Sequence, residues 1–273
     1  MKKLNIIFVI LIAIFFNSCE DVVNVDLNTE KPRLVIDASI NWYKGTTGND
    51  QKIKLTTTTN YFTNVIPTVS GATIFIKNSA NTIFNFIETP NTGEYICNNF
   101  APVINEVYTL TVISNGQTYT AVETLKSVAV ISSIVQNNQG GFTGNDIEIK
   151  TLYQDPAIDD NYYLYKYKYS IQPKPDYYVD QDEFFQGNLF FSISQNSKLK
   201  IGDQIEVTHF GISKQYYNYL SVLLSIAGNS GGGPFQSPPA TVKGNIINQT
   251  NFDNYTLGYF RLSEADTRNY TIQ

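Results

Sequence analysis

The sequence predicts an all-β protein, with an N-terminal immunoglobulin-like β-sandwich followed by a second β-sandwich or barrel-like domain that carries one amphipathic helix. Aromatic residues make up 14% of the chain, and Tyr, Phe, Thr and Ile, which favour half-buried pleated surfaces, recur throughout. Many short segments alternate apolar and polar residues, and Gly, Asn and Pro separate them. Residues 213–228 instead repeat apolar residues at helical spacing.

The first predicted domain covers residues 32–127. About seven short β-type segments over roughly a hundred residues fit an immunoglobulin-like sandwich. Asn115-Gly116 is the clearest hairpin signal, because both central positions of a type I′ turn need positive φ. The predicted strands are residues 33–40, 52–55, 72–77, 82–87, 94–97, 107–113 and 117–124.

The second predicted domain covers residues 128–273, and residues 136–145 near its start are predicted as a loop. Ser213 is the predicted helix N-cap, and Gly228 ends the helix. We expect this helix to cover a sheet face or to plug an open barrel end. The predicted strands are residues 128–135, 146–153, 162–171, 189–193, 204–210, 241–247, 256–262 and 269–272.

The N-terminus has the pattern of a bacterial lipoprotein leader. Lys2 and Lys3 precede an uncharged apolar run at residues 6–16, which is short for a membrane span. Ser18 and Cys19 follow as in a lipobox, so we predict that residues 1–18 are cleaved and that Cys19 is lipidated. Residues 19–31 would then form a tether. The alternative is an uncleaved anchor with an incidental cysteine.

An acidic pair follows the predicted lipidation site directly. Glu20 and Asp21 resemble the signal that moves lipoproteins to the outer face of the outer membrane in Bacteroidota. We therefore expect an outer-membrane protein that faces the extracellular side, anchored by its N-terminal lipid. A solvated tether on a protein that faces the periplasm remains the alternative.

Charge and motif content exclude several function classes. The net charge of −5 argues against nucleic acid, which needs a basic face to neutralise phosphates. The chain has a single histidine, His209, so it cannot build a His-based metal site or catalytic dyad. No catalytic, phosphate-binding or cofactor motif occurs. We therefore predict no enzyme, no metal and no cofactor.

A tyrosine ladder is the first candidate contact surface. Tyr163, Tyr165, Tyr167 and Tyr169 fall on one face of a predicted strand, where they could stack against sugar rings or a flat organic ligand. The alternative is a sandwich or barrel wall that is lined by tyrosine.

Two predicted loops supply further candidate contacts. Tyr177 and Tyr178 lie in an acidic stretch, residues 176–183, whose carboxylates suit either calcium or plain solvation. Phe235 is an apolar residue in a loop rich in Gly and Pro, where it either contacts a partner or packs into the core.

Several short segments match one family in order along nearly the whole mature chain. They include Cys19-Glu20-Asp21, Pro32-Arg33-Leu34-Val35-Ile36, Gly93-Glu94-Tyr95, Asp155-Pro156, Pro238-Pro239-Ala240-Thr241-Val242-Lys243-Gly244-Asn245 and Leu257-Gly258-Tyr259-Phe260. Together they resemble the Bacteroidota lipoprotein family catalogued as domain of unknown function 4249 (DUF4249). The resemblance implies a two-part β lipoprotein, often encoded beside TonB-dependent receptors of the SusC type. It implies no catalytic or ligand residue.

The anchor and the resemblance suggest an accessory binding or lid subunit of a TonB-dependent nutrient transporter. The alternative is a freestanding surface adhesin or glycan-binding lipoprotein that has no transport partner. These two hypotheses differ in whether a receptor accompanies the protein.

Overall fold

The computed structural model describes residues 31–273 except 61–62, 64, 142–143 and 229–240. Residues 32–273 form one compact unit. The predicted signal peptide, Cys19, Glu20, Asp21 and Phe235 lie outside the described residues, so their predicted roles stay predictions. Within the described part of the chain, no helix is both long and apolar enough to cross a membrane.

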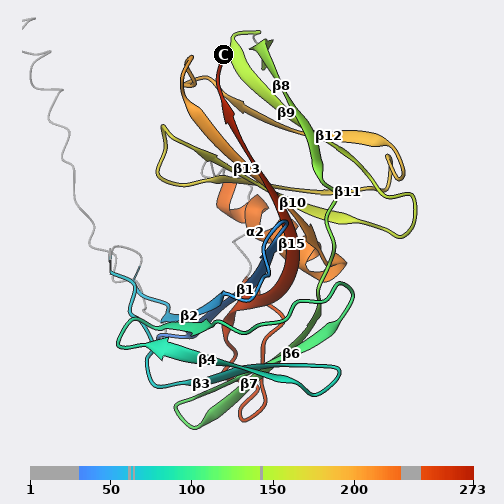
Figure 1. The fold of residues 1–273 in the computed structure, drawn as a ribbon. Coiled ribbons are helices and arrows are strands. Elements are labelled where there is room, and N and C mark those ends of the chain that lie inside the picture. Colours follow the sequence, from blue (N-terminus) through green and yellow to red (C-terminus); the bar gives the residue numbers. More distant parts are fainter. Residues whose placement is uncertain (1–30, 61–62, 64, 142–143, 229–240) are drawn as a thin grey trace, which may run out of the picture. The chain divides into compact units, whose positions relative to one another are not determined.

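The first part of the compact unit is a β-sandwich, as predicted (Figure 1). Alternate residues of its strands point inward and form one apolar core, for which Ile36, Ile53 and Tyr108 are fully buried examples. Cys97 is a small buried member of this core. The strands are β1 (Leu34–Tyr43), β2 (Gln51–Thr57), β3 (Thr73–Asn78), β4 (Ile83–Thr89), β5 (Glu94–Cys97), β6 (Val107–Ser114) and β7 (Gln117–Thr124).

Two local features hold this sandwich together. Asn115 and Gly116 have φ of 50° and 72°, which confirms the predicted tight turn between β6 and β7. Strand β4 pairs with β3 through its first residues and with β5 through its last ones. One strand therefore links the two layers of the sandwich.

The second part has a sheet that is covered on both faces. On one face a layer of three strands encloses a tyrosine-rich core, and on the other the helix packs over Leu164, Phe210 and Ile212. The sheet strands are β10 (Tyr162–Tyr169), β11 (Asp176–Gln181), β13 (Gln204–Ile212) and β15 (Leu257–Thr271). The covering elements are β8 (Ile131–Gly140), β9 (Asp146–Gln154), β12 (Leu189–Asn196) and the helix α2 (Lys214–Gly228).

Strand β15 belongs to both parts (Figure 1). Its first residues pair in parallel with β1, from Leu257 opposite Val35 to Ala265 opposite Tyr43. Its later residues pair antiparallel with β13. Because Phe260 lies in the core of the first sandwich, the chain's last strand completes its first domain. The predicted division after residue 127 stays a prediction, with β15 shared across it.

The predicted helix and its cap are confirmed. The Ser213 hydroxyl accepts a hydrogen bond from the Tyr216 backbone N–H at 3.2 Å, which satisfies one of the free donors at the helix start. The helix covers a sheet face, with Leu220 packed against Leu164 and Phe210. The predicted all-β class with one amphipathic helix therefore holds.

Several segment predictions were wrong. Residues 176–181, which we predicted as part of an acidic loop, form strand β11. Their backbone groups pair with the edge of β10, and this pairing outweighs the local preference for a turn. Strand β8 extends through residues predicted as loop. Of residues 241–247 only the last enters a strand, β14 (Ile247–Asn248). The two short strands predicted near the C-terminus are one long strand, β15.

Candidate functional site

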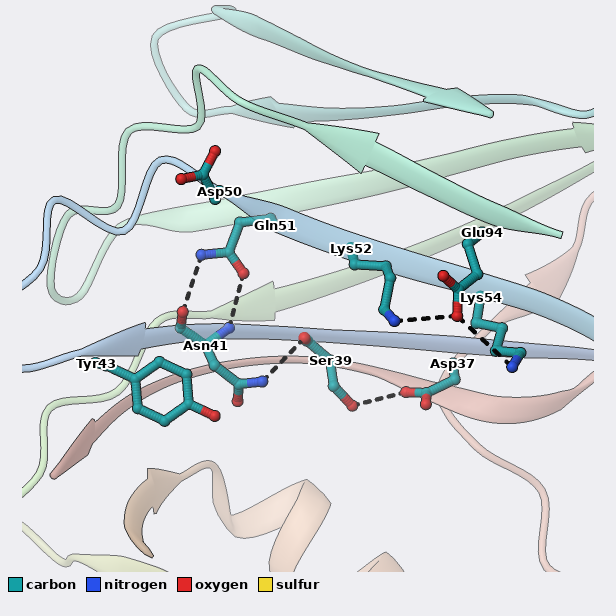
Figure 2. Close-up of a pocket in the computed structure, with 9 residues that line it drawn as sticks. All are labelled: Asp37, Ser39, Asn41, Tyr43, Asp50, Gln51, Lys52, Lys54 and Glu94. Atoms are coloured by element: carbon teal, nitrogen blue, oxygen red, sulfur yellow. Dashed lines mark hydrogen bonds and ion pairs between the residues drawn. The ribbon is translucent and has the colours of Figure 1, made fainter. Parts of the chain in front are cut away.

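An open cavity lies on the outer face of the first sandwich, with a volume of about 380 Å³. Every lining side chain carries a polar or charged group, and Figure 2 shows those of Asp37, Ser39, Asn41 and Tyr43 in a row along β1. This size fits a small hydrophilic ligand. The lining residues are Asp37, Ser39, Asn41 and Tyr43 of β1, Asp50 before β2, Gln51, Lys52 and Lys54 of β2, and Glu94 of β5.

Strand alternation places these side chains together. In β1 the residues Ile36, Ala38 and Ile40 are buried, so the polar residues between them point to the other face. The sheet register then sets Lys54 opposite Asp37 on one side and opposite Glu94 on the other. A polar surface forms because three neighbouring strands turn their polar faces the same way.

Hydrogen bonds fix the floor of the cavity before any ligand arrives. The Gln51 amide accepts from the Asn41 backbone N–H at 3.0 Å and donates to the Asn41 carbonyl at 2.9 Å. Asn41 donates through Nδ2 to the Ser39 carbonyl at 3.3 Å, and the Ser39 hydroxyl donates to Asp37 Oδ1 at 2.8 Å. Figure 2 shows this chain of contacts along β1. A preorganised polar wall loses less entropy when it binds.

The charged end of the cavity is a shared ion pair. Glu94 Oε1 lies 3.0 Å from Lys52 Nζ and 3.7 Å from Lys54 Nζ. The hydrogen bond and the charge of Lys52 hold the pKa of the Glu94 carboxyl below its usual value, with Lys54 adding a smaller effect. The carboxylate therefore stays ionised at neutral pH and can accept hydrogen bonds from ligand hydroxyls.

Tyr43 forms the aromatic end of the cavity, and 40% of it is exposed. Burial raises the pKa of Tyr43, the nearby Arg261 guanidinium lowers it, and Glu206 raises it, with a net upward direction. The hydroxyl therefore remains protonated at neutral pH and serves as a donor beside an apolar ring face. Such a ring next to amides and carboxylates suits a ligand that combines hydroxyl groups with an apolar face.

The predicted tyrosine ladder lies elsewhere and is closed. Tyr163, Tyr165, Tyr167 and Tyr169 do share one face of β10, but each is at most 2% exposed. They face the three-stranded layer of β8, β9 and β12, within the tyrosine-rich core. The structure favours the alternative interpretation, a sandwich wall lined by tyrosine.

The ladder hydroxyls all have internal partners. Tyr165 and Tyr153 share a hydrogen bond at 2.6 Å, and Tyr163 donates to the buried Asp155 carboxylate at 2.5 Å. Tyr167 donates to Thr151 at 3.1 Å, and the Tyr169 hydroxyl bonds that of Ser194. Burial drives the pKa of all four phenols upward. This network stabilises the core, since a buried hydroxyl without a partner is costly.

The two tyrosines of β11 point to opposite sides. Tyr178 is 38% exposed, and its ring lies edge-on to Tyr167 at 5.7 Å between centroids. Tyr177 is 44% exposed, and its pKa is raised by burial, lowered by Arg261 and raised by Tyr43, among others. Of the predicted contact residues, Tyr177 is therefore the one that the fold brings near the cavity.

The buried Asp182 of the acidic stretch and the buried His209 both contact other residues of the protein. Asp182 is buried and accepts hydrogen bonds from the backbone and side chain of Asn161, at 2.8 and 3.1 Å. Within the described ranges, no three His, Cys, Asp or Glu side chains gather as a metal site would require. His209 is fully buried among the rings of Tyr153, Tyr163 and Tyr165, with centroid distances of 4.5–4.8 Å.

None of the residues that line the cavity was predicted as a contact residue. Residues 33–40 looked like a mostly apolar run, although Asp37 and Ser39 alternate with apolar neighbours within it. The strict alternation of residues 52–55 did signal a wet face on β2. No local pattern could show that three such faces adjoin. The register places Asp37 and Glu94, which are far apart in the sequence, on either side of Lys54.

Two comparisons concern other proteins. The structure is similar to a two fibronectin type-III domain segment from chicken tenascin, at 10% sequence identity and a TM-score of 0.22. That match covers 67% of this chain and 91% of the tenascin segment. No curated protein matches the chain.

The remaining comparison identifies the family. The family model described as a domain of unknown function, DUF4249, matches residues 20–269. The match spans both β parts and the helix, so it covers the cavity as well as the tyrosine core. The chain therefore belongs to the DUF4249 family.

Proposed function

We propose that this protein is a lipid-anchored binding protein of the outer membrane, facing the extracellular side, and that it serves a TonB-dependent nutrient transporter as accessory binding or lid subunit. The observation that carries the binding role is the preorganised polar cavity on β1, β2 and β5. Its amides, carboxylates, ammonium groups and tyrosine can hydrogen-bond a hydrophilic nutrient.

The chain's organisation supports the anchoring part of the proposal. The predicted lipidation site, Cys19, precedes the compact unit of residues 32–273 in the sequence. A tethered body stays near any receptor in the same membrane, which raises its effective concentration there. The acidic pair Glu20 and Asp21 is the feature that favours the extracellular face.

The cavity chemistry favours binding over catalysis. The Glu94 carboxyl has a lowered pKa because it is held by Lys52 and Lys54, so it is a poor general acid near neutral pH. The Asp37 carboxylate accepts from the Ser39 hydroxyl, and that hydroxyl has no neighbouring base such as His to activate it within the lining set. These groups are suited to hold a ligand.

Affinity purification tests the proposal directly. The tagged, full-length protein is recovered from native outer membranes in mild detergent, and mass spectrometry identifies what accompanies it. We expect a TonB-dependent receptor near one-to-one stoichiometry. A Cys19→Ser variant is the control, because it lacks the thiol that is acylated and should lose both the membrane fraction and the receptor.

Recovery of the lipidated protein without any receptor would reject the transporter role. In that case normal nutrient uptake in a deletion strain, together with glycan binding by the protein, would establish the alternative of a freestanding glycan-binding lipoprotein. A Cys19→Ser variant that stays in the membrane fraction would reject the lipid anchor.

A further inference from the structure

Arg261 of β15 is a buried arginine beside the cavity. It is 8% exposed, and its neighbour across the parallel pairing with β1 is Ser39, one of the lining residues. Its Nη1 donates to Asn41 Oδ1 at 2.8 Å, and Asn41 also lines the cavity. The guanidinium carbon lies 5.0 Å from the ring centre of Phe210 and 5.6 Å from that of Tyr216.

Within the described part of the chain, this guanidinium has no direct ion-pair partner. Among the same residues, its buried Nε has no hydrogen-bond partner. Arg268 on the same strand is paired, with its Nη1 2.8 Å from Asp266. Buried cations are normally paired because desolvation is costly, and the aromatic contacts offset only part of that cost.

Tyrosine hydroxyls lie around Arg261, and the Asp37 carboxylate also acts on two of these tyrosines, Tyr177 and Tyr216. The guanidinium acts on the pKa of Tyr43, Tyr177 and Tyr216, and in each phenol burial outweighs it and raises the pKa. Tyr43 and Tyr177 are partly exposed, and Tyr43 lines the cavity. An anion placed here would meet one fixed positive charge and several hydroxyl donors.

We propose that Arg261, with Asn41 and Tyr43, binds the anionic group of a ligand whose hydroxyl-rich body occupies the cavity. The chemical class is an acidic sugar. The proposal rests on the binding role of the cavity and is independent of the transporter partnership. A guanidinium presents a planar set of donors that matches a carboxylate in geometry as well as charge.

The charge pattern along the cavity orients such a ligand. Asp37 lies four residues before Asn41 on β1, which corresponds to about 13 Å along the strand. The proposal places the sugar carboxylate at the Asn41 and Tyr43 end, because Arg261 donates to Asn41 there. Asp37 and the Glu94 carboxylate at the opposite end accept hydrogen bonds from ring hydroxyls.

Isothermal titration calorimetry on the full-length, lipidated protein in detergent micelles tests the proposal. The probes are D-galacturonate, D-glucuronate and N-acetylneuraminate, with D-galactose as the neutral counterpart of the first. The variants are Arg261→Met, which removes the charge at similar volume, and Arg261→Lys, which keeps the charge but loses the planar fork. Arg268→Met is the matched control on the same strand.

We expect at least one acidic sugar to bind the wild-type protein more tightly than galactose. Arg261→Met should weaken that binding by about tenfold or more, and Arg261→Lys should weaken it less. Arg268→Met should leave it unchanged. Equal affinity for galacturonate and galactose, unchanged binding by Arg261→Met, or no acidic sugar bound up to about 10 mM, would each overturn the proposal.

The melting temperature of the Arg261→Met variant distinguishes a ligand-binding role of Arg261 from a purely structural one. If Arg261 served only to hold α2 through its aromatic contacts, Arg261→Met would lower the melting temperature. A binding role predicts a melting temperature equal to or above that of the wild-type protein, because the variant removes a buried charge that has no direct ion-pair partner among the described residues. A clear loss of stability with unchanged sugar binding would therefore assign Arg261 to structure. Failure of this test leaves the receptor purification result untouched.

Discussion

The outer face of β1 and the inner face of β10 arise from the same alternating sequence pattern, but one is open to solvent and the other is buried. Both strands place polar or aromatic side chains at every second position. On β1 the resulting row lines an open cavity, and Tyr43 is 40% exposed. On β10 the row is sealed by a second sheet, and Tyr165 is 1% exposed. A row of tyrosines therefore does not by itself mark a ligand platform.

The difference lies in what packs against each face. Strands β8, β9 and β12 cover β10 and supply partners for its hydroxyls, including Tyr153 and Asp155. Among the residues that the structure describes, no such layer covers the cavity on β1, β2 and β5, and the lining side chains bond mainly within these strands. Similar polar groups therefore stabilise the core beneath β10 and remain available to a ligand on β1.

The largest expected effect compares the two tyrosine environments. Tyr165→Ala should lower the free energy of unfolding by about 3–5 kcal/mol, since it leaves a cavity in the core and removes the partner of the Tyr153 hydroxyl. Tyr43→Ala should cost less than about 1 kcal/mol, because Tyr43 lies at a surface. Urea denaturation followed by circular dichroism measures both. Similar losses in the two variants would remove the distinction between an open and a closed face.

Gly258 tests the packing beneath the open face, where β15 pairs with the core residue Ile36 of β1. Its φ is +93°, and a Cβ would lie 2.1 Å from the Ile36 carbonyl oxygen. Gly258→Ala should therefore cost about 3 kcal/mol. Gly71→Ala is the control, with a similar positive φ but nothing within 4 Å, and should cost about 1 kcal/mol. Equal melting temperatures for the two variants would show that the close approach is unimportant.

His209 gives the closed core a pH-dependent stability. Burial lowers the pKa of His209 to about 3, with Lys44 lowering it further and the Ala129 backbone opposing the shift. The unfolded chain takes up the proton as pH falls through about 6.5, whereas the folded chain stays neutral. Stability is therefore full above that pH and declines below it, until the folded pKa is reached. At pH 5 the loss should be about 2 kcal/mol.

His209→Gln isolates this contribution in urea titrations at pH 7 and pH 5. Burial raises the pKa of Glu123, Asp155 and Asp180, which favours the folded state as pH falls, but both proteins share those groups. The wild-type protein should lose about 2 kcal/mol more than the variant between the two pH values. An identical pH dependence would mean that His209 is protonated in the folded protein.

Ser213→Ala should have the smallest effect. The Ser213 hydroxyl caps α2 and also donates to the buried Glu123 carboxylate at 2.8 Å. Its loss should cost about 1 kcal/mol, measured as a lower melting temperature. Ser213→Thr keeps both hydrogen bonds and is the control. Since α2 carries Tyr216 against Arg261, a Thr variant as unstable as the Ala variant would point to packing in place of the cap.

Local chemistry was enough to predict most elements. The alternation of Lys52 to Leu55, the Asn115-Gly116 turn and the cap at Ser213 each involve residues close together in the sequence. Strand β11 was missed because Asp176 and Asp180 favoured an acidic loop, although the residues between them suit a strand. It pairs with the edge of β10, which lies outside its local sequence. The candidate site was missed for a related reason: its parts come from β1, β2, β5 and β15, which only the sheet register joins.

The sequence alone determined the all-β class, the helix and its cap, the hairpin between β6 and β7, and the family. These follow from backbone preferences and side-chain alternation, which act over a few residues, and from an ordered set of short segments. Only the tertiary structure decided that the tyrosines of β10 are core, that β15 completes the first sandwich and that Arg261 lies unpaired beside an open polar cavity. Burial and charge compensation depend on which distant segments pack together, and no local pattern contains that information.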